Sequence, residues 1–316
     1  MSRHWTETSV PDLRGRTAVV TGANTGLGFE TARTLAGHGA AVILACRNPV
    51  KAAAAAERIR DVAPGTQVRT VPLDLASLDS VKQAAARLHD ECPALDLLIN
   101  NAGGVRPRGG RTEDGFEATL GANHLGPFAF TGRVLDLLLA APGSRIVTVS
   151  SVGHRRGVIN FDDPHFERGY RYGPAYFQAK LANLMFTYEL QRRLAGATAA
   201  TIAVAAHPGN ARTEFGRDMS AFVRVAMNPR LRALTSWLMQ SQEAGARPIV
   251  RAAADPRVRG GEYYGPDGWN EWTGHPVVVE SIPASHDAAA QRRLWDLSEK
   301  LTGVTYHLTG QDVPQR

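Results

Sequence analysis

The feature that most constrains the fold is a short apolar run that ends in a glycine-rich turn and leads into a helix. Residues 17–21 are small or β-branched without polar alternation, which is typical of a strand buried on both faces of a parallel sheet. The turn carries Gly22, Gly26 and Gly28, and an amphipathic segment then runs to about His38. Gly22 permits the tight turn, Gly26 lets backbone N–H groups approach a pyrophosphate, and Gly28 lets the helix pack on the strand. A plain tight turn would explain the glycines alone, but strand, turn and helix together predict a phosphate-binding loop.

The alternation of strand and helix continues along the chain. We expect strands at 41–45, 67–73, 95–100, 145–151 and 201–206, and helices at 77–91, 115–139 and 175–194. This pattern predicts a doubly wound Rossmann α/β fold, a parallel sheet with helices on both faces, in which ligands bind beyond the carboxyl ends of the strands. Without a repeat or a long linker, residues 16–316 should form a single domain that follows a polar, peripheral N-terminal tail at 1–15.

The second predicted strand ends near the position that contacts the adenosine ribose. Arg47 lies nineteen residues after Gly28, where an acidic residue would accept hydrogen bonds from a ribose 2′-hydroxyl. A guanidinium there is suited instead to a bidentate grip on a 2′-phosphate. Arg47 therefore favours NADP(H) over NAD(H) as the cofactor. The alternative is that Arg47 is simply a solvated surface arginine.

Tyr176 and Lys180 are four residues apart in the predicted helix 175–194, so both side chains should lie on one helix face. An ammonium roughly 4 Å from a tyrosine hydroxyl, at an effective dielectric of about 20, favours the phenolate by about 4 kcal/mol. We therefore expect a lowered pKa for Tyr176, which would make it a usable acid and base near neutral pH. Any helix can carry this pair, but here Ser150 and Ser151 end the preceding predicted strand.

Composition excludes several other classes of protein. No apolar run reaches the ~18 residues of a membrane span and the first residues lack the apolar core of a secretory signal, so we expect a cytoplasmic protein without a membrane partner. Cys46 and Cys92 have no metal-ligand spacing, which indicates neither a disulfide framework nor a metal site. The net charge of +6 comes mainly from scattered arginines. This distribution lacks the basic stripe that nucleic-acid binding needs, and it favours phosphorylated ligands instead.

The order and spacing of these residues resemble the short-chain dehydrogenases/reductases, in the branch with the signatures TGxxxGxG and YxxxK. The matching positions are Thr21, Gly22, Gly26, Gly28, Asp74, Asn100, Asn101, Ala102, Gly103, Asn123, Ser151, Tyr176, Lys180, Pro208 and Gly209. Strings such as Asn123-His-Leu-Gly126 and Lys180-Leu-Ala-Asn183 are most similar to the retinol-dehydrogenase-like and WW-domain-oxidoreductase-like branch. Pro127 stands where that branch leads us to expect histidine, and it predicts a local change in the helix.

The resemblance implies an NADP(H)-dependent oxidoreductase that transfers hydride between nicotinamide and a carbonyl or alcohol of a lipophilic small molecule. Tyr176 would exchange a proton with the substrate oxygen and Ser151 would hydrogen-bond that oxygen. Lys180 would hold the nicotinamide ribose, and Asn123 would anchor a water that relays protons to the lysine. The implied cofactor-binding residues are Gly22, Asn24, Thr25, Gly26, Leu27, Gly28, Arg47, Asp74, Leu75, Asn101, Ala102, Gly103, Tyr176, Lys180, Pro208, Gly209 and Thr213.

The region at about 213–240 mixes apolar side chains with arginines at roughly helical intervals. In the family this region forms a substrate lid, which implies a bulky hydrophobic ligand, although core-facing positions of two short helices would give the same pattern. Family members often pair through the helix that bears the tyrosine, but the sequence does not separate an exposed apolar stripe from a buried one, so a homodimer is left open. Two alternatives remain: a non-catalytic dinucleotide-binding regulator on the same fold, which usually lacks the tyrosine or lysine, and a sugar epimerase or dehydratase on a related fold.

Overall fold

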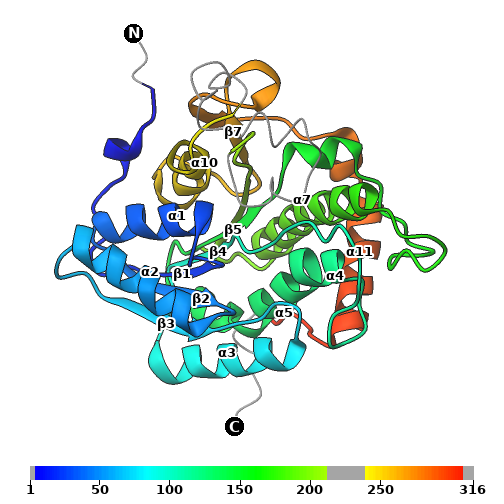
Figure 1. Cartoon of the computed structure of the whole chain (residues 1–316), viewed down its shortest axis with the longest axis horizontal. Coiled ribbons are helices and arrows are strands. Elements are labelled where there is room, and N and C mark those ends of the chain that lie inside the picture. Colours follow the sequence, from blue (N-terminus) through cyan, green and yellow to red (C-terminus); the bar gives the residue numbers. More distant parts are fainter. Residues whose placement is uncertain (1–3, 212–238, 309–316) are drawn as a thin grey trace.

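The computed structural model describes residues 4–211 and 239–308, and within these ranges the strands form one eight-stranded sheet (Figure 1). Their order in the sheet is β3-β2-β1-β4-β5-β6-β7-β8, and all neighbours pair in parallel except β7 and β8. The strands are β1 (Thr17–Thr21), β2 (Ala41–Cys46), β3 (Val68–Pro72), β4 (Leu97–Asn100), β5 (Arg145–Val149), β6 (Ile202–Ala206), β7 (Tyr263–Pro266) and β8 (Pro276–Val278). The predicted doubly wound α/β fold is confirmed, and its strand order reverses between β1 and β4, where such sheets open a crevice for ligands.

Helices cover both faces of this sheet (Figure 1). One layer contains α1 (Gly26–Gly37), α2 (Pro49–Val62) and α10 (Gln242–Ala254). The opposite layer contains α3 (Leu78–Glu91), α5 (Gly126–Arg133), α6 (Leu135–Leu139), α7 (Tyr172–Gly196) and α11 (Ala288–Thr302). The shorter elements are η1 (Glu7–Ser9), α4 (Ala118–Leu120), η2 (Gly121–Leu125), η3 (Val152–Arg156), η6 (Trp269–Glu271) and η7 (Pro283–His286).

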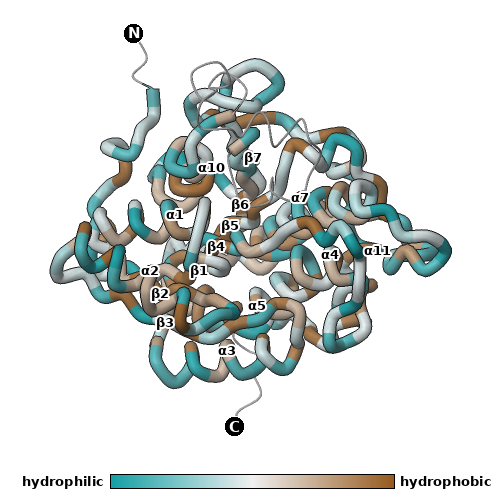
Figure 2. The backbone as a smooth tube through the Cα atoms, in the orientation of Figure 1, coloured by the Kyte–Doolittle hydropathy of each residue, from teal (hydrophilic) through white to brown (hydrophobic). Residues whose placement is uncertain are grey.

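Side chains of β1 alternate between these two layers because successive residues of a strand point to opposite faces. Ala18 and Val20 pack with α1, α2 and α10, whereas Val19 packs with α3 and α5. The strand is apolar throughout because both faces are covered, and Figure 2 shows the hydrophobic stretches gathered along the central strands. No helix in the described ranges is both long and apolar enough to cross a membrane.

The N-terminal segment lies at the periphery, as Figure 1 shows, but it is packed against the domain. Trp5, Val10 and Leu13 are buried in the layer that contains α1. Arg33 of α1 also lies 3.2 Å from the Glu7 carboxylate. The expected tail therefore contributes to the core, a role that its mostly polar composition conceals.

The helix before Pro127 is locally altered, as predicted. Proline has no N–H to donate to the carbonyl of Asn123, four residues earlier. The preceding segment, η2, is a π-helical turn, in which the Gly126 N–H bonds to the carbonyl of Gly121, five residues earlier. This turn places Asn123 at a bend between α4 and α5.

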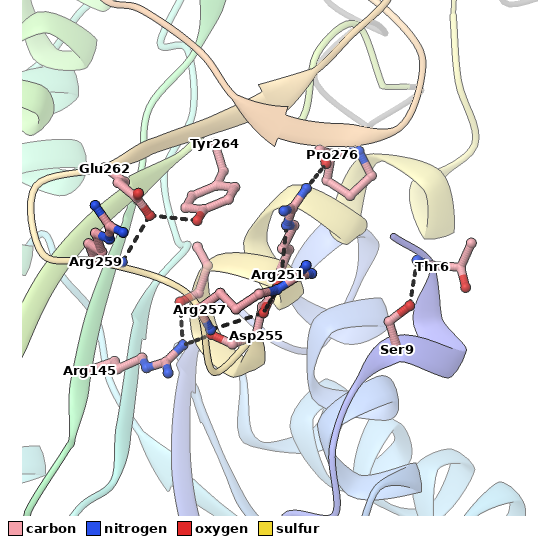
Figure 3. A network of polar contacts seen from close by, with 11 residues as sticks. Thr6, Ser9, Arg145, Arg251, Asp255, Arg257, Arg259, Glu262, Tyr264 and Pro276 are labelled. Carbon is pink, nitrogen blue, oxygen red and sulfur yellow. Dashed lines mark hydrogen bonds and ion pairs between the residues drawn. The ribbon is translucent and has the colours of Figure 1, made fainter. Parts of the chain in front are cut away.

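A network around Asp255 ties the end of α10 to the sheet (Figure 3). Arg145 at the start of β5 donates to the Asp255 carbonyl at 2.8 Å. The Asp255 carboxylate, itself 2% exposed, lies 3.0 Å from Arg257 Nη2 and 3.2 Å from Arg251 Nε. Arg251 also donates to the Pro276 carbonyl on β8. Asp255 thus connects α10 to β5 through its backbone carbonyl, and its carboxylate holds Arg251, which reaches β8.

We expect Asp255→Ala to lower the free energy of unfolding by about 2 kcal/mol, measured by chemical denaturation at neutral pH. Burial raises the pKa of Asp255, but the hydrogen bonds and charges of Arg257 and Arg251 outweigh burial and bring the pKa below its ordinary value. A carboxyl with a lowered folded-state pKa stabilises the fold above its unfolded pKa and loses that contribution as the pH falls through the folded value. The difference between variant and parent should therefore shrink in acid.

Asp162→Ala is the matched control, since Asp162 is 86% exposed and 3.6 Å from Arg293. Exposed ion pairs contribute little, about 0 to 1 kcal/mol, so this variant should unfold almost like the parent. Equal effects of the two substitutions would show that the network contributes no more than a surface pair.

Candidate active site

A cavity of about 880 Å³ lies where β4, β5 and β6 end, beside the first turn of α1. Among its lining residues, the ones predicted from sequence are Leu27, Asn101, Gly103, Ser151, Tyr176, Lys180, Pro208 and Gly209. They come from five separate segments of the chain. The fold therefore brings the predicted catalytic tyrosine, lysine and serine to the same cavity as parts of the predicted dinucleotide site.

Lys180 is fixed at the end of β5. Its Nζ donates to the Val149 carbonyl at 3.1 Å, and burial lowers the pKa of this lysine to about 8. The same ammonium lies 5.7 Å from the ring centroid of Tyr176. Asn183, one helical turn further on, also donates to the Val149 carbonyl at 3.1 Å.

The predicted lowering of the tyrosine pKa is not found. Desolvation raises the pKa of Tyr176, and a hydrogen bond with the Ser151 side chain only partly opposes that rise. The lysine ammonium is directed to the Val149 carbonyl, so burial dominates over attraction between the two side chains. At neutral pH Tyr176 is therefore protonated and able to donate a proton.

Asn123 uses both ends of its amide to hold the loop that follows β4. Its Nδ2 donates to the carbonyls of Gly104 and Thr119 at 2.8 Å each, and its Oδ1 accepts from the Gly104 N–H at 2.8 Å. A Cβ on Gly103 would come within 2.4 Å of that Oδ1 and 3.5 Å of Lys180 Nζ. Asn123 thereby sets the loop against the lysine, and its expected water-binding role stays a prediction.

The glycine-rich turn has the geometry that a pyrophosphate requires. Gly22 and Gly26 have φ values of +66° and +62°, in the left-handed region that favours glycine. A Cβ on Gly28 would lie 2.5 Å from Asn101 Nδ2 and 2.6 Å from the Gly22 carbonyl. Thr25 is the N-cap residue of α1, but its side chain accepts no hydrogen bond from the helix. The Thr25 side chain therefore does not cap the first N–H groups of α1. These features fit the phosphates of a dinucleotide.

A second cavity, of about 360 Å³, adjoins the first through Gly103 and Gly104, which line both. Its other lining residues that were predicted from sequence are Gly22, Asn24, Arg47, Asp74, Leu75, Ala102 and Asn123. Arg47 Nη1 lies 3.8 Å from Asp74 Oδ2. The two residues predicted to contact the adenosine end are thus neighbours at the expected edge of the sheet.

Sequence reasoning missed Lys51 and Arg106, which line this second cavity as well. Lys51 lies in the first turn of α2, where its backbone N–H donates to the side chain of Asn48 at 3.0 Å. An asparagine followed by proline is a recognisable helix start, and this signal would have placed Lys51 beside Arg47.

The rest of the wall of the larger cavity is mainly apolar and aromatic. Its lining includes Val105, Pro107, Val152, Tyr172, Pro174, Phe177 and Met239, with Arg156 and Arg171 among them. Gln240 Nε2 donates to the Pro208 carbonyl at 2.6 Å. Thr213 and most of the expected lid at 213–240 lie outside the described residues. Only residues 239 and 240 of the lid belong to the described part of the chain.

Comparisons with known proteins agree with this geometry. The family model described as short chain dehydrogenase matches residues 16–223, more than half of the chain. The chain belongs to the short-chain dehydrogenase family. Retinol dehydrogenase 13 of Homo sapiens is 41% identical over 295 residues, covering 92% of this chain and 86% of the relative. Retinol dehydrogenase 14 of Homo sapiens is 40% identical over 308 residues, covering 92% and 88%.

A solved structure of an uncharacterized protein from Mycobacterium paratuberculosis is similar over its whole length. It is 37% identical, with a TM-score of 0.79, and the match covers 97% of this chain and 100% of that one. The similarity to the retinol-dehydrogenase-like branch is therefore confirmed, and the short-chain dehydrogenase is an NAD(P)-dependent oxidoreductase that acts on CH–OH groups.

The close contacts of Gly28 generate a prediction. Gly28→Ala should weaken binding of NADPH and lower the free energy of unfolding by about 1 to 3 kcal/mol, because the added methyl group must displace Asn101 or the turn itself. Isothermal titration and chemical denaturation would measure the two effects.

Gly37→Ala is the control in the same helix. Nothing lies within 4 Å of a Cβ at Gly37, so alanine there should be neutral or stabilise the helix by up to about 1 kcal/mol. If Gly28→Ala behaved like this control, the close approach of Gly28 to the turn would have no importance for the site.

Proposed function

We propose that this short-chain dehydrogenase uses NADP(H) to interconvert a carbonyl and an alcohol on a lipophilic small molecule. The observation that carries the proposal is the placement of Tyr176 and Ser151 on one cavity, with Lys180 beside them and apolar and aromatic side chains on the remaining wall. The proposal includes a cytoplasmic location for the enzyme.

The bound nicotinamide would supply or accept the hydride. Tyr176, protonated at neutral pH, donates its proton to the carbonyl oxygen in the reducing direction and recovers it in the oxidising direction. Ser151 donates a hydrogen bond to the same oxygen and stabilises the charge that develops on it. Lys180 is held by its bond to the Val149 carbonyl, and its other N–H groups would be available to hold the nicotinamide ribose.

Three basic side chains support the preference for NADP(H). Arg47, Lys51 and Arg106 line the smaller cavity, and Asp74 is the only carboxylate among its described lining residues. A ribose 2′-phosphate carries about two negative charges and binds best where several cations can reach it.

The relatives by name act on retinol, a long apolar alcohol, and the apolar wall of the larger cavity suits a substrate of that class. The oligomeric state stays open. Trp295 of α11 packs against Phe128 of α5 and Phe186 of α7, with ring centroids 5.2 and 5.9 Å apart. Pairing through this face of α7 would have to displace α11.

Tyr176→Phe should reduce turnover of lipophilic aldehydes and ketones by at least about 10²-fold, because the proton donor is lost, while the affinity for NADPH stays nearly unchanged. Consumption of NADPH with a panel of such carbonyls, and a fluorescence titration with NADPH alone, would measure both.

Tyr188→Phe is the matched control, since Tyr188 lies on the same helix but does not line the cavity. It should retain most of the activity. Comparable turnover in Tyr176→Phe and the parent would contradict the catalytic assignment. NADPH binding without turnover of any carbonyl or alcohol in the panel would favour the alternative, a non-catalytic dinucleotide-binding regulator.

The cofactor preference is tested by Arg47→Asp and Lys51→Gln. Arg47→Asp should weaken NADPH by about 10²-fold, since a charge-assisted contact of about 1.5 to 3 kcal/mol is replaced by repulsion. NADH should bind the variant almost as it binds the parent. Lys51→Gln should act in the same direction with a smaller effect.

Lys82→Gln serves as the control for Lys51. Lys82 lies on α3, is exposed and does not line the cavity, so its loss should leave both affinities unchanged. Equal weakening of NADPH and NADH by Arg47→Asp would contradict the preference for NADP(H).

A further inference from the structure

The loop after β7 brings one carboxylate against two loops of the catalytic cavity. Glu271 Oε1 lies 2.6 Å from Arg155 Nη2, and Glu271 Oε2 lies 2.9 Å from His207 Nε2. Arg155 belongs to η3, the turn that starts directly after Ser151, and His207 directly precedes Pro208 and Gly209. One side chain thus connects the segments that follow β5 and β6, which are neighbours in the sheet.

His207 connects Glu271 to the Pro208–Gly209 turn. The imidazole is fully buried, and its Nδ1 accepts a hydrogen bond from the Gly209 N–H at 3.2 Å. The ring proton of a neutral imidazole that accepts at Nδ1 is on Nε2, the atom that faces Glu271. Burial lowers the pKa of His207, and the nearby carboxylate only partly opposes this, so the neutral form prevails at neutral pH.

The loop that carries Glu271 is fitted closely to the same turn. Asn210 N–H donates to the Trp272 carbonyl at 2.7 Å, and a Cβ on Gly209 would come within 2.4 Å of that carbonyl. Asn270 and Glu271 have φ values of +50° and +58°, which residues other than glycine rarely adopt. Backbone strain of this kind persists where the surrounding contacts require it, and it clusters at functional sites.

The η3 turn fixes the other side of the cavity. His154 is buried, and both its backbone N–H and its Nδ1 contact the Ser151 carbonyl, at 3.0 and 2.6 Å. The Ser151 hydroxyl oxygen accepts from the Gly153 N–H at 3.1 Å. The orientation of Ser151 therefore depends on the η3 turn. Arg155 of the same turn is held by Glu271.

We propose that Glu271 is a positioning residue that sets the Ser151 turn and the Gly209 turn at a fixed geometry. The proposal rests on the proposed function, in which Ser151 contacts the substrate oxygen, and on the role in cofactor binding that the family resemblance implies for Pro208 and Gly209. Glu271 does not line the catalytic cavity and acts through Arg155 and His207.

Glu271→Gln keeps the shape of the side chain and removes its charge. We expect the amide of Gly209 to exchange hydrogen roughly tenfold faster and NADPH to bind roughly tenfold more weakly, because the charged contacts of Glu271 with Arg155 and His207 are weakened. Hydrogen exchange with mass spectrometry and a fluorescence titration with NADPH measure these effects on the full chain. Turnover of a carbonyl that the parent reduces should fall as well.

Arg155→Gln should change the same quantities in the same direction. The double variant Arg155→Gln with Glu271→Gln should be no worse than Glu271→Gln alone, because both remove the same contact. Glu262→Gln is the matched control. Glu262 also accepts hydrogen bonds in the β7 region, from Tyr264 and Arg259, but it does not line the catalytic cavity.

Parent-like exchange at Gly209 together with parent-like NADPH affinity in Glu271→Gln would overturn the proposal. So would additive effects in the double variant, or a loss of thermal stability equal to that of Glu262→Gln without a change in NADPH affinity. If the parent binds NADPH but reduces no carbonyl, the proposed function fails, while faster exchange and weaker NADPH binding in Glu271→Gln still support the positioning role.

Discussion

The catalytic cavity depends on how a buried cation joins α7 to the end of β5. Taking an ammonium out of water costs several kcal/mol unless hydrogen bonds replace its hydration. Lys180 obtains such a bond from the Val149 carbonyl, and the Ser150 hydroxyl donates at 2.8 Å to the carbonyl of Lys180 itself. Because these bonds fix the register of α7 on the strand, Tyr176, one turn earlier in the helix, is directed to the cavity beside Ser151. The position of the proton donor thus follows from the bonds of the lysine.

A second constraint acts on the loop after β4. The three bonds of Asn123 leave room beside Lys180 only for a residue without a side chain, and Gly103 meets that requirement. The π-helical turn before Pro127 carries Asn123 at this bend. Catalytic geometry must be held within a fraction of an ångström to be effective, and here buried hydrogen bonds hold it on both sides of the cavity.

The sequence predicted the first six strands of the sheet and residues that meet at the candidate site, because buried β-branched runs, glycine turns and the Tyr-Lys spacing are local signals. It did not reveal β7, which has four residues, or β8, which has three and pairs antiparallel at the sheet edge, because both runs are too short for a period to be recognised. Nor could it give the pKa of Tyr176. Only the attraction between Tyr176 and Lys180 is visible in the spacing, whereas burial and the bond from Lys180 to Val149 depend on the folded chain.

The contacts of Glu271 show why some functional groups leave no motif. Arg155, His207 and Glu271 follow β5, β6 and β7, and they meet only because those strands are adjacent in the sheet. Burial raises the pKa of Glu271, but His207 and Arg155 outweigh it and keep the carboxylate charged. The Glu271 carboxylate is half-buried and contacts Arg155 on one side and His207 on the other. If it moved away from either residue, it would lose a strong contact without gaining full hydration, so it tolerates little displacement. In the proposed positioning role, three residues remote in sequence therefore set the distance between the Ser151 turn and the Gly209 turn.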